Sequence, residues 1–335
     1  RIRNAKMKAE EKQVGRYSAT TTALLYLDGV VYLPICEEMR KRLDAFEVDG
    51  IEDGGMIEYL TRKKKEGRFP VYQTTERPDR AAQAILEGRV VLLTDNSPEA
   101  LIFPATLNSL FQTADDYYRN ERIVTFLRLI RYVAAFLALA LPGLYVAAAT
   151  FHPQLLPGNL IRSMAEARSG VPFPTAAEVL LMELSFELLR EAGLRMPGPA
   201  GNTIGIVGGL IVGQAAVSAN LVSPITVTVA ALTALGSFSI PNEELSEVFR
   251  LWKYGILLLG SCFGILGVML GCFLLLMLMA EQESYGIPWL YPYVGGNLNE
   301  RADEKDSMFL AAARKRKRRP IFAKWGNRIR FRRKS

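Results

Sequence analysis

The sequence has very few of the residues that enzymes most often use for catalysis or metal binding. His152 is the only histidine, so neither a catalytic triad nor a histidine-based metal site can be assembled. Cys36, Cys262 and Cys272 are too far apart for a zinc motif, and three cysteines do not indicate a disulfide framework. No phosphate-binding glycine loop or serine elbow is present. We therefore expect no enzyme activity, no metal and no cofactor.

Charge is missing from three long stretches. Residues 132–151, 196–242 and 254–280 contain no charged side chain, and they are 20, 47 and 27 residues long. A transmembrane helix needs about 20 apolar residues. The longest stretch has room for two helices, because Pro224 disfavours helix at the residue before it. We predict four spans, near residues 132–150, 202–222, 224–241 and 254–280.

The N-terminal part alternates strand and helix patterns. TTALLYLDGVVYL is rich in strand-forming residues, whereas ICEEMRKRLDAF repeats apolar positions at helical spacing. In GRVVLLTDNSPEALIFPA, two apolar runs flank a turn-forming Asp-Asn-Ser-Pro cluster, which predicts a β-hairpin. We expect an α/β N-terminal soluble domain at 1–120, an all-α polytopic membrane domain with an additional amphipathic helix at 121–293, and a basic tail at 294–335.

The excess of positive charge in the chain, formally +7, comes from the C-terminal tail. Residues 314–334 contain twelve Lys and Arg and no acid, which leaves 29 basic against 34 acidic residues elsewhere. The positive-inside rule places this tail, and the cluster Arg122, Arg128 and Arg131, in the cytoplasm. We therefore expect both termini to be cytoplasmic. The tail favours anionic membrane lipids over nucleic acid, at about 1 kcal/mol per basic residue near the surface.

Two sets of glycines recur at helical spacing. The first is Gly201, Gly205, Gly209 and Gly213, and the second is Gly260, Gly264, Gly267 and Gly271. Small residues on one helix face allow another backbone to approach closely, which is how helices associate in lipid. We predict two helix-packing faces, whose partner is either another helix of this chain or another copy.

Polar groups within the longest uncharged stretch are candidates for an ion path. Gln214 and Asn220 are the two amides among them, beside several Ser and Thr. We favour the alternative that the hydroxyls bond their own helix carbonyls and that the amides bridge neighbouring helices. Gln214 is the strongest exception, because an amide has four hydrogen-bonding sites to satisfy.

An acidic stripe marks the predicted amphipathic helix at 176–193. Glu183, Glu187 and Glu191 follow one another at four-residue spacing, on one face of an otherwise apolar helix. Several copies around an axis would form rings of carboxylates that favour cations. We favour the alternative that Arg190 and Arg195 neutralise this stripe through helix pairs.

Aromatic residues follow the last predicted span. Tyr285, Trp289, Tyr291 and Tyr293 lie in the run SYGIPWLYPYVGG. Trp and Tyr are enriched at membrane interfaces. We therefore expect this run to lie at the membrane surface.

Several motifs together resemble the A-subunit family of spore germinant receptors, the GerA family, which includes stage V sporulation protein AF. They include FPVYQTTERPD, LEGRVVLLTDNSP, FQTADDYY, LPGLYVAAATFHPQLLP, ELLREAGLRMP and TIGIVGGLIVGQAAV, and the similarity covers about residues 15–293. The combination is specific, unlike any single glycine motif. Its family-motif residues are Thr75, Glu76, Arg77, Pro78, Asp79, Arg190, Glu191 and Arg195.

This resemblance implies a multi-pass subunit of a receptor in the spore inner membrane. Its partners would be a transporter-like B subunit that senses nutrients and a C-subunit lipoprotein. Family models imply that A subunits associate into a ring around an ion-conducting pore. Family members usually carry another subdomain ahead of the region where this sequence starts, so we expect the N-terminal domain to be incomplete.

Three functions remain distinct at this point. The first is a gated channel subunit that releases monovalent cations, either in a receptor or as the stage V sporulation paralogue. The second is a non-conducting scaffold that couples the nutrient sensor to a separate channel. The third, a membrane-anchored enzyme, lacks a nucleophile or metal constellation in residues 1–120.

Overall fold

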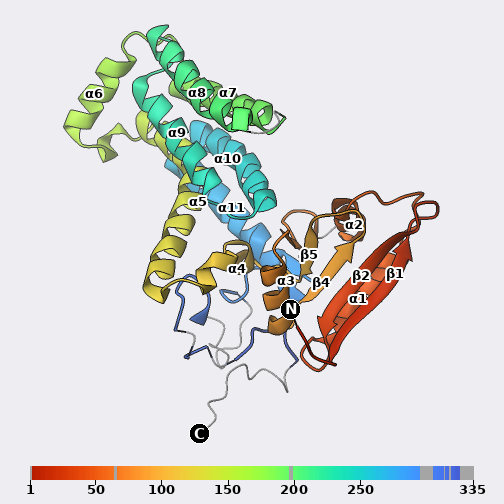
Figure 1. The fold of residues 1–335 in the computed structure, drawn as a ribbon. Helices are drawn as coiled ribbons and strands as arrows, with labels where there is room; N and C mark the ends of the chain where they lie inside the picture. Colours follow the sequence, from red (N-terminus) through yellow and green to blue (C-terminus); the bar gives the residue numbers. More distant parts are fainter. Residues whose placement is uncertain are drawn as a thin grey trace. The chain divides into compact units, whose positions relative to one another are not determined.

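The chain forms two compact units. The computed structural model describes residues 2–63, 66–195, 199–294, 305–312, 314–316 and 318–324, and only the backbone at 199–207 and 210. The α/β unit comprises residues 1–130, 241–245 and 277–335, and the helical unit comprises 131–240 and 246–276 (Figure 1). Residues 277–293, expected in the membrane domain, fall in the α/β unit.

A five-stranded antiparallel sheet is the centre of the α/β unit. Its spatial order is β1-β2-β4-β5-β3. The strands are β1 Met7–Val14, β2 Thr20–Leu27, β3 Gln73–Thr75, β4 Val90–Thr94 and β5 Ala100–Phe103. The predicted hairpin is confirmed as β4 and β5, where Val91 pairs with Ile102. Asn96 in its turn has φ +66°, a conformation that Asn tolerates better than most residues.

Helices cover both faces of this sheet. The helices are α1 Leu33–Asp44, α2 Gly54–Thr61, α3 Pro78–Glu87 and the short α4 Leu107–Leu110, followed by a 3-10 turn at Ala114–Tyr117. Leu92 packs with Met39 of α1 in one apolar core. Val91, its neighbour on β4, packs with Ile85 of α3 in a second core. This alternation follows from the two-residue side-chain period of a strand.

The C-terminal segment packs into the α/β unit, which corrects the expected interfacial aromatic belt. Two short strands, β6 Glu283–Ser284 and β7 Ile287–Pro288, follow the last helix. Trp289 is fully buried, and Tyr285 and Tyr291 are 8% and 4% exposed. Further along, Ala323 bridges to Val31. These three aromatic rings therefore fill a protein core, whereas Tyr293 is 48% exposed. The described part of the basic tail packs on the same unit, whereas residues 325–335 lie outside the described part.

The helical unit is built from long apolar helices. They are α5 Glu121–Thr150, α6 Gly158–Arg168, α7 Thr175–Leu194, α8 Pro199–Ser218, α9 Pro224–Phe238, α10 Glu243–Phe263 and α11 Ile265–Glu281, with a 3-10 turn at Pro153–Leu155. The amphipathic helix expected at 176–193 is confirmed as α7. Helices α5 and α9 run antiparallel, because Tyr145 lies 3.3 Å from Thr226 while Gly236 lies against the carbonyl of Ala134.

Residues 254–280 do not form the single span expected from the sequence. Gly264 has φ +62°, which ends α10 at Phe263 and lets α11 begin at the next residue. A Cβ added to Gly271 would lie 3.4 Å from the Cα of Ile256. Two residues this close in space and fifteen apart in sequence must lie on two antiparallel helices that pack together. The absence of charge over residues 254–280 could not predict this hairpin, because the chain reverses at a single glycine and no charged residue marks the turn.

The apolar surfaces of these helices differ in length. Among the described residues, α5 is the one helix long and apolar enough to cross a membrane, and α9 and α11 are apolar but shorter. Helix α11 has 17 residues, or about 26 Å at 1.5 Å per residue. Large apolar side chains are exposed on the hairpin, including Leu258, Leu266, Met269 and Phe273. The four-span count remains a prediction.

Candidate functional site

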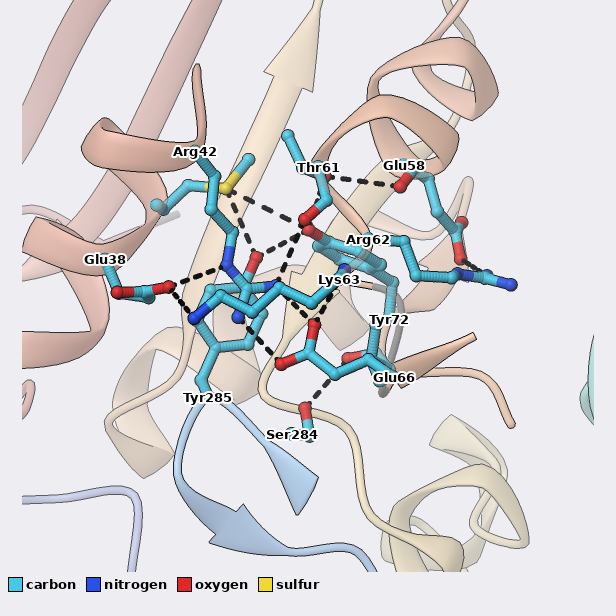
Figure 2. Close-up of polar contacts among 12 residues, drawn as sticks. Glu38, Arg42, Glu58, Thr61, Arg62, Lys63, Glu66, Tyr72, Ser284 and Tyr285 are labelled. Carbon is cyan, nitrogen blue, oxygen red and sulfur yellow. Dashed lines mark hydrogen bonds and ion pairs between the residues drawn. The ribbon is translucent and has the colours of Figure 1, made fainter. Parts of the chain in front are cut away.

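Arg42 of α1 is the centre of a buried polar cluster in the α/β unit (Figure 2). Its guanidinium makes two bonds to the carboxylate of Glu66, at 2.5 and 2.7 Å, and a third to Glu38 at 3.1 Å. It also stacks over the ring of Tyr285, 4.1 Å from the centroid. Burial, the largest single effect, lowers the pKa of Arg42, but its interactions with neighbouring groups, including Glu66 and Glu38, together outweigh burial and raise this pKa. Arg42 is therefore a fixed cation that holds the C-terminal segment.

Two tyrosines join this segment to the sheet side of the cluster. The hydroxyl groups of Tyr72 and Tyr285 lie 2.5 Å apart, and Tyr72 also lies 2.6 Å from the hydroxyl of Thr61. Burial raises the pKa of both phenols, so both stay protonated at neutral pH. Tyr285 also stacks on Phe103 of β5, with ring centroids 4.8 Å apart. One tyrosine thus contacts a helix, a strand and a loop.

Backbone and indole contacts fix the rest of the segment. The Trp289 indole donates to the carbonyl of Pro70 at 2.7 Å, and the Ser284 hydroxyl donates to that of Val71 at 3.1 Å. The Gln282 amide donates to the carbonyl of Glu66 at 3.0 Å. Because Gln282 directly follows α11, the end of this helix is tied to the α/β unit. An open cavity of about 620 Å³ lies beside these contacts, lined by Arg42, Lys63 and Glu283 among others.

We expect Tyr285→Phe to lower the free energy of unfolding by about 1 kcal/mol. The substitution removes one buried hydroxyl, while Tyr72 keeps its bond to Thr61. Urea unfolding of the purified chain in detergent measures the change. Tyr59→Phe is the matched control, because Tyr59 is 79% exposed, and it should change stability by less than about 0.5 kcal/mol. Equal effects would contradict the role given to the Tyr285 hydroxyl.

A second charged cluster joins α7 to α10 in the helical unit. Glu183 pairs with Lys253 at 2.6 Å, and both side chains are at most 5% exposed. One turn further along α7, Glu187 pairs with Arg250. The acidic stripe is therefore neutralised mainly across helices, and not by the arginines of its own helix as expected. We expected Glu187 to pair with Arg190, three residues along α7; the structure pairs Glu187 with Arg250, and Arg190 lies over the ring of Phe238.

The remaining acids of α7 have separate roles. Glu191 pairs with Arg195 at 2.6 Å, as predicted, and both are exposed. Glu178 is fully buried, and its carboxylate accepts from the backbone N–H of Ser223 at 2.9 Å and from the Thr226 hydroxyl at 3.1 Å. It thereby caps the start of α9.

The predicted amides lie on the surface of the helical unit. Gln214 and Asn220 are both exposed, and Asn220 has φ +53° just after α8 ends. Neither lies with the acidic stripe inside this chain. The expectation for the hydroxyls is confirmed at several positions: Thr228, Thr233, Ser237 and Ser239 bond carbonyls of their own helix.

The glycine faces pack against helices of the same chain. Gly209 lies against Phe186 of α7 and Gly213 against Val227 of α9. The surroundings of Gly201 and Gly205 lie outside what the structure describes. In the second set, Gly260, Gly267 and Gly271 lie between α10 and α11, and Gly264 lies against His152. The second set thus packs a hairpin and not one straight helix.

The TERPD motif forms the start of α3. Thr75 and Glu76 lead into Arg77, the N-cap residue, and Pro78 and Asp79 occupy the first turn. Arg77 bonds Asp79 at 3.0 Å and Asp115 at 2.8 Å. The bond from Arg77 lowers the pKa of Asp79 from 3.8 to about 2. The motif therefore links α3 to the turn ahead of α5.

Acid stability should report the Arg77–Asp79 pair. The folded pKa of Asp79 lies below its unfolded value, so its contribution is present above about pH 3.8 and is lost as pH falls toward about 2. We expect the stability gap between wild type and Arg77→Gln to shrink over that window. Thermal unfolding between pH 5 and pH 2.5 measures this difference. The control is the same comparison in an Asp79→Asn background, with and without Arg77→Gln, where the stability difference should lose its dependence on acid pH. A gap that does not vary with pH would refute the assignment.

Sequence reasoning missed the cations of both clusters. Arg250 and Lys253 precede an uncharged stretch at three-residue spacing, which places them on one helix face, and this matches the one-sided arrangement of the acidic stripe at four-residue spacing. That match was the available signal. For Arg42, four-residue spacing could have indicated Glu38, whereas its partners Glu66 and Tyr285 come from distant parts of the chain. Within the described residues, no group of three or more His, Cys, Asp or Glu is placed to hold a metal ion.

Fold and contacts together define a protein with an α/β unit and a bundle of largely apolar helices. Within the bundle, charged pairs join neighbouring helices. A family model described as "Bacillus/Clostridium GerA spore germination protein" matches residues 1–322. The chain therefore belongs to the GerA spore germination protein family.

Curated relatives agree with this membership. The chain is 38% identical over 312 residues to the membrane protein YfkQ of Bacillus subtilis, covering 93% of this chain and 60% of YfkQ. It is 37% identical over 291 residues to spore germination protein KA of the same organism, covering 87% of this chain and 54% of that protein. The chain thus spans little more than half the length of these relatives. A crystal structure of the N-terminal domain of the A subunit of the Bacillus megaterium spore germinant receptor GerK3 is 31% identical, covers 31% of this chain and 82% of that chain, and has a TM-score of 0.24.

Proposed function

We propose that this chain is the A subunit of a spore germinant receptor in the spore inner membrane. With further copies, its helical unit forms a gated path for monovalent cations, which opens when a transporter-like B subunit binds nutrient. The observation that carries the proposal is the buried Glu183–Lys253 pair within a bundle of apolar helices. Charges inside such helices are costly and mark functional positions.

Helix directions support a membrane arrangement. The chain leaves the α/β unit after residue 130 and again after residue 245, and it has returned to it by residues 241 and 277. Helix α9 runs opposite to α5, and α11 runs opposite to α10. We place both termini in the cytoplasm in this proposal, as the positive-inside rule predicts.

Surface polar groups provide contacts for neighbouring copies. Gln214, Asn220 and Glu191 are exposed on the helical unit. In a ring of copies, these groups would line or flank the path, where amides and carboxylates favour cations. The lipoprotein C subunit and anionic lipids complete the assembly, and the chain itself performs no catalysis.

Ion flux tests this proposal. Vesicles loaded with K⁺ and reconstituted with the chain and its B and C subunits should release K⁺ when the nutrient of the B subunit is added. Gln214→Leu and Glu191→Gln should each change the K⁺ to Na⁺ preference by about threefold or more. Glu166→Gln is the control, because Glu166 is exposed on α6 outside the proposed path, and it should leave the preference unchanged.

The competing function is a non-conducting scaffold. It predicts no nutrient-dependent flux from the complete complex, and it predicts that Gln214→Leu and Glu191→Gln weaken only the binding of partner subunits. Either result would overturn the channel proposal. A further alternative is that the chain is the stage V sporulation protein AF paralogue, which would amplify ion release.

A further inference from the structure

Four arginines gather under α3 and the described tail in the α/β unit. They are Arg80, Arg89, Arg128 and Arg316. Arg80 and Arg89 are each 3% exposed. Tyr117 lies among them, with the guanidinium carbons of Arg128 and Arg316 at 5.8 and 5.3 Å from its ring. Such a concentration of buried cations needs compensating negative charge.

The nearby carboxylates pair with only some of these arginines. Asp306 bonds Arg128 at 3.0 Å and Arg316 at 3.2 Å, and Asp116 bonds Arg128 at 3.1 Å. Arg89 has neither acid as a partner, and its bond to the Gln73 amide oxygen is long, at 3.4 Å. Burial lowers the pKa of Arg89 to about 10, so it remains charged at neutral pH. With Glu87 counted, four cations face three acids among the residues that the structure describes here, which leaves one positive charge.

Arginine N–H groups without a hydrogen-bond partner indicate where an anion could balance the remaining positive charge. Among the described atoms, the Nε groups of Arg80, Arg89 and Arg316 are buried and have no hydrogen-bond partner. Arg89 and Arg316, together with the exposed Arg318, line a small cavity of about 40 Å³. A cavity of roughly 10–15 Å³ on this measure holds one water, so this one admits a small polyatomic ion.

We propose that this cavity binds a small oxyanion of the phosphate type, held by Arg89 and Arg316 with Arg318 at its mouth. Arginine donors match the geometry of such oxygens and form charge-assisted bonds with them. The ion neutralises the surplus cation and joins the tail segment 314–322 to β4 and α3. Bound ion therefore strengthens the packing of the C-terminal tail.

Thermal unfolding of the full chain in detergent, titrated with inorganic phosphate against NaCl at equal ionic strength, tests the site. Wild type should show a saturable rise in Tm, from which an apparent Kd follows by linkage. Arg316→Gln should weaken this Kd about tenfold or more, because it removes a charge-assisted bond. Lys315→Gln, next to it and exposed, should leave the Kd unchanged.

General salt effects are separated from binding by the same variants. Phosphate strengthens burial in all proteins by exclusion from their surfaces, and that rise persists in Arg316→Gln. Arg89→Met keeps the apolar contact with Phe322 and should abolish the saturable part. If Arg89→Met fails to fold, Arg316→Gln and Arg318→Gln still decide. No saturable rise in wild type, or the same Kd in wild type and Arg316→Gln, would overturn the proposal. A rise with phosphatidate in mixed micelles but none with inorganic phosphate would overturn the free ion in favour of a lipid headgroup.

Discussion

Gly267→Ala should destabilise the chain by about 3 kcal/mol, one of the two largest effects that the structure predicts. A Cβ at this position would overlap the carbonyl oxygen of Leu259 on the facing helix. A backbone atom cannot rotate away as a side chain does, so α10 and α11 would have to separate. The measurement is the free energy of unfolding in detergent, followed by helix content.

Gly255→Ala is the matched control for this prediction. It makes the same substitution in α10, where nothing lies within 4 Å of an added Cβ. Alanine also favours helix over glycine by about 1 kcal/mol. Gly255→Ala should therefore be neutral or mildly stabilising. If the two variants were equally stable, α10 and α11 would not pack as a hairpin.

Lys253→Met should destabilise the chain by about 3–5 kcal/mol, because it leaves the carboxylate of Glu183 buried without its cation. Both partners are at most 5% exposed, and they lie 2.6 Å apart. The double variant Glu183→Leu with Lys253→Met should recover most of this loss, since apolar replacement of a buried pair is often neutral. Unfolding of the two single variants and the double variant closes a thermodynamic cycle.

The exposed pair of the same helix is the control. Arg195→Met removes the ion pair with Glu191. Arg195 and Glu191 are 79% and 58% exposed, so the substitution should lower the free energy of unfolding by less than about 1 kcal/mol. If the stable double variant also loses nutrient-dependent flux, the buried pair serves the ion path and not only the fold. A coupling energy near zero would show that Glu183 and Lys253 do not interact.

Local features of the fold were predictable from the sequence. The β4–β5 hairpin followed from apolar runs around a turn cluster, and α7 followed from its helical period. The Glu191–Arg195 pair was predictable for the same reason, because four-residue spacing determines which side chains meet. The glycine spacing predicted helix packing, and side chains of neighbouring helices lie against Gly209 and Gly213.

Contacts between distant segments were not predictable in this way. The reversal at Gly264 depends on one positive φ angle, which composition does not reveal in an uncharged run. Tyr285 and Trp289 have the composition of an interfacial belt, yet their partners Tyr72 and Pro70 lie more than 200 residues away. Pairing of Glu183 with Lys253, and not with an arginine of its own helix, likewise depends on how helices pack.

The central claim is that residues 246–276 leave and re-enter the α/β unit as a glycine-packed hairpin beside the charged face of α7. A disulfide between Ile256→Cys and Gly271→Cys tests it most directly, in a chain with Cys262→Ser and Cys272→Ser. Cys36 can stay, because burial raises its pKa to about 12 and keeps the thiol unreactive.

Oxidation in the membrane should cross-link most of the 256–271 pair within one chain, because an added Cβ at Gly271 lies 3.4 Å from the Cα of Ile256. Leu258→Cys with Gly271→Cys is the control and should not cross-link, since Leu258 is 59% exposed. In one straight helix, residues 256 and 271 would lie about 22 Å apart. Failure of the 256–271 pair to form a disulfide in folded protein would contradict the hairpin.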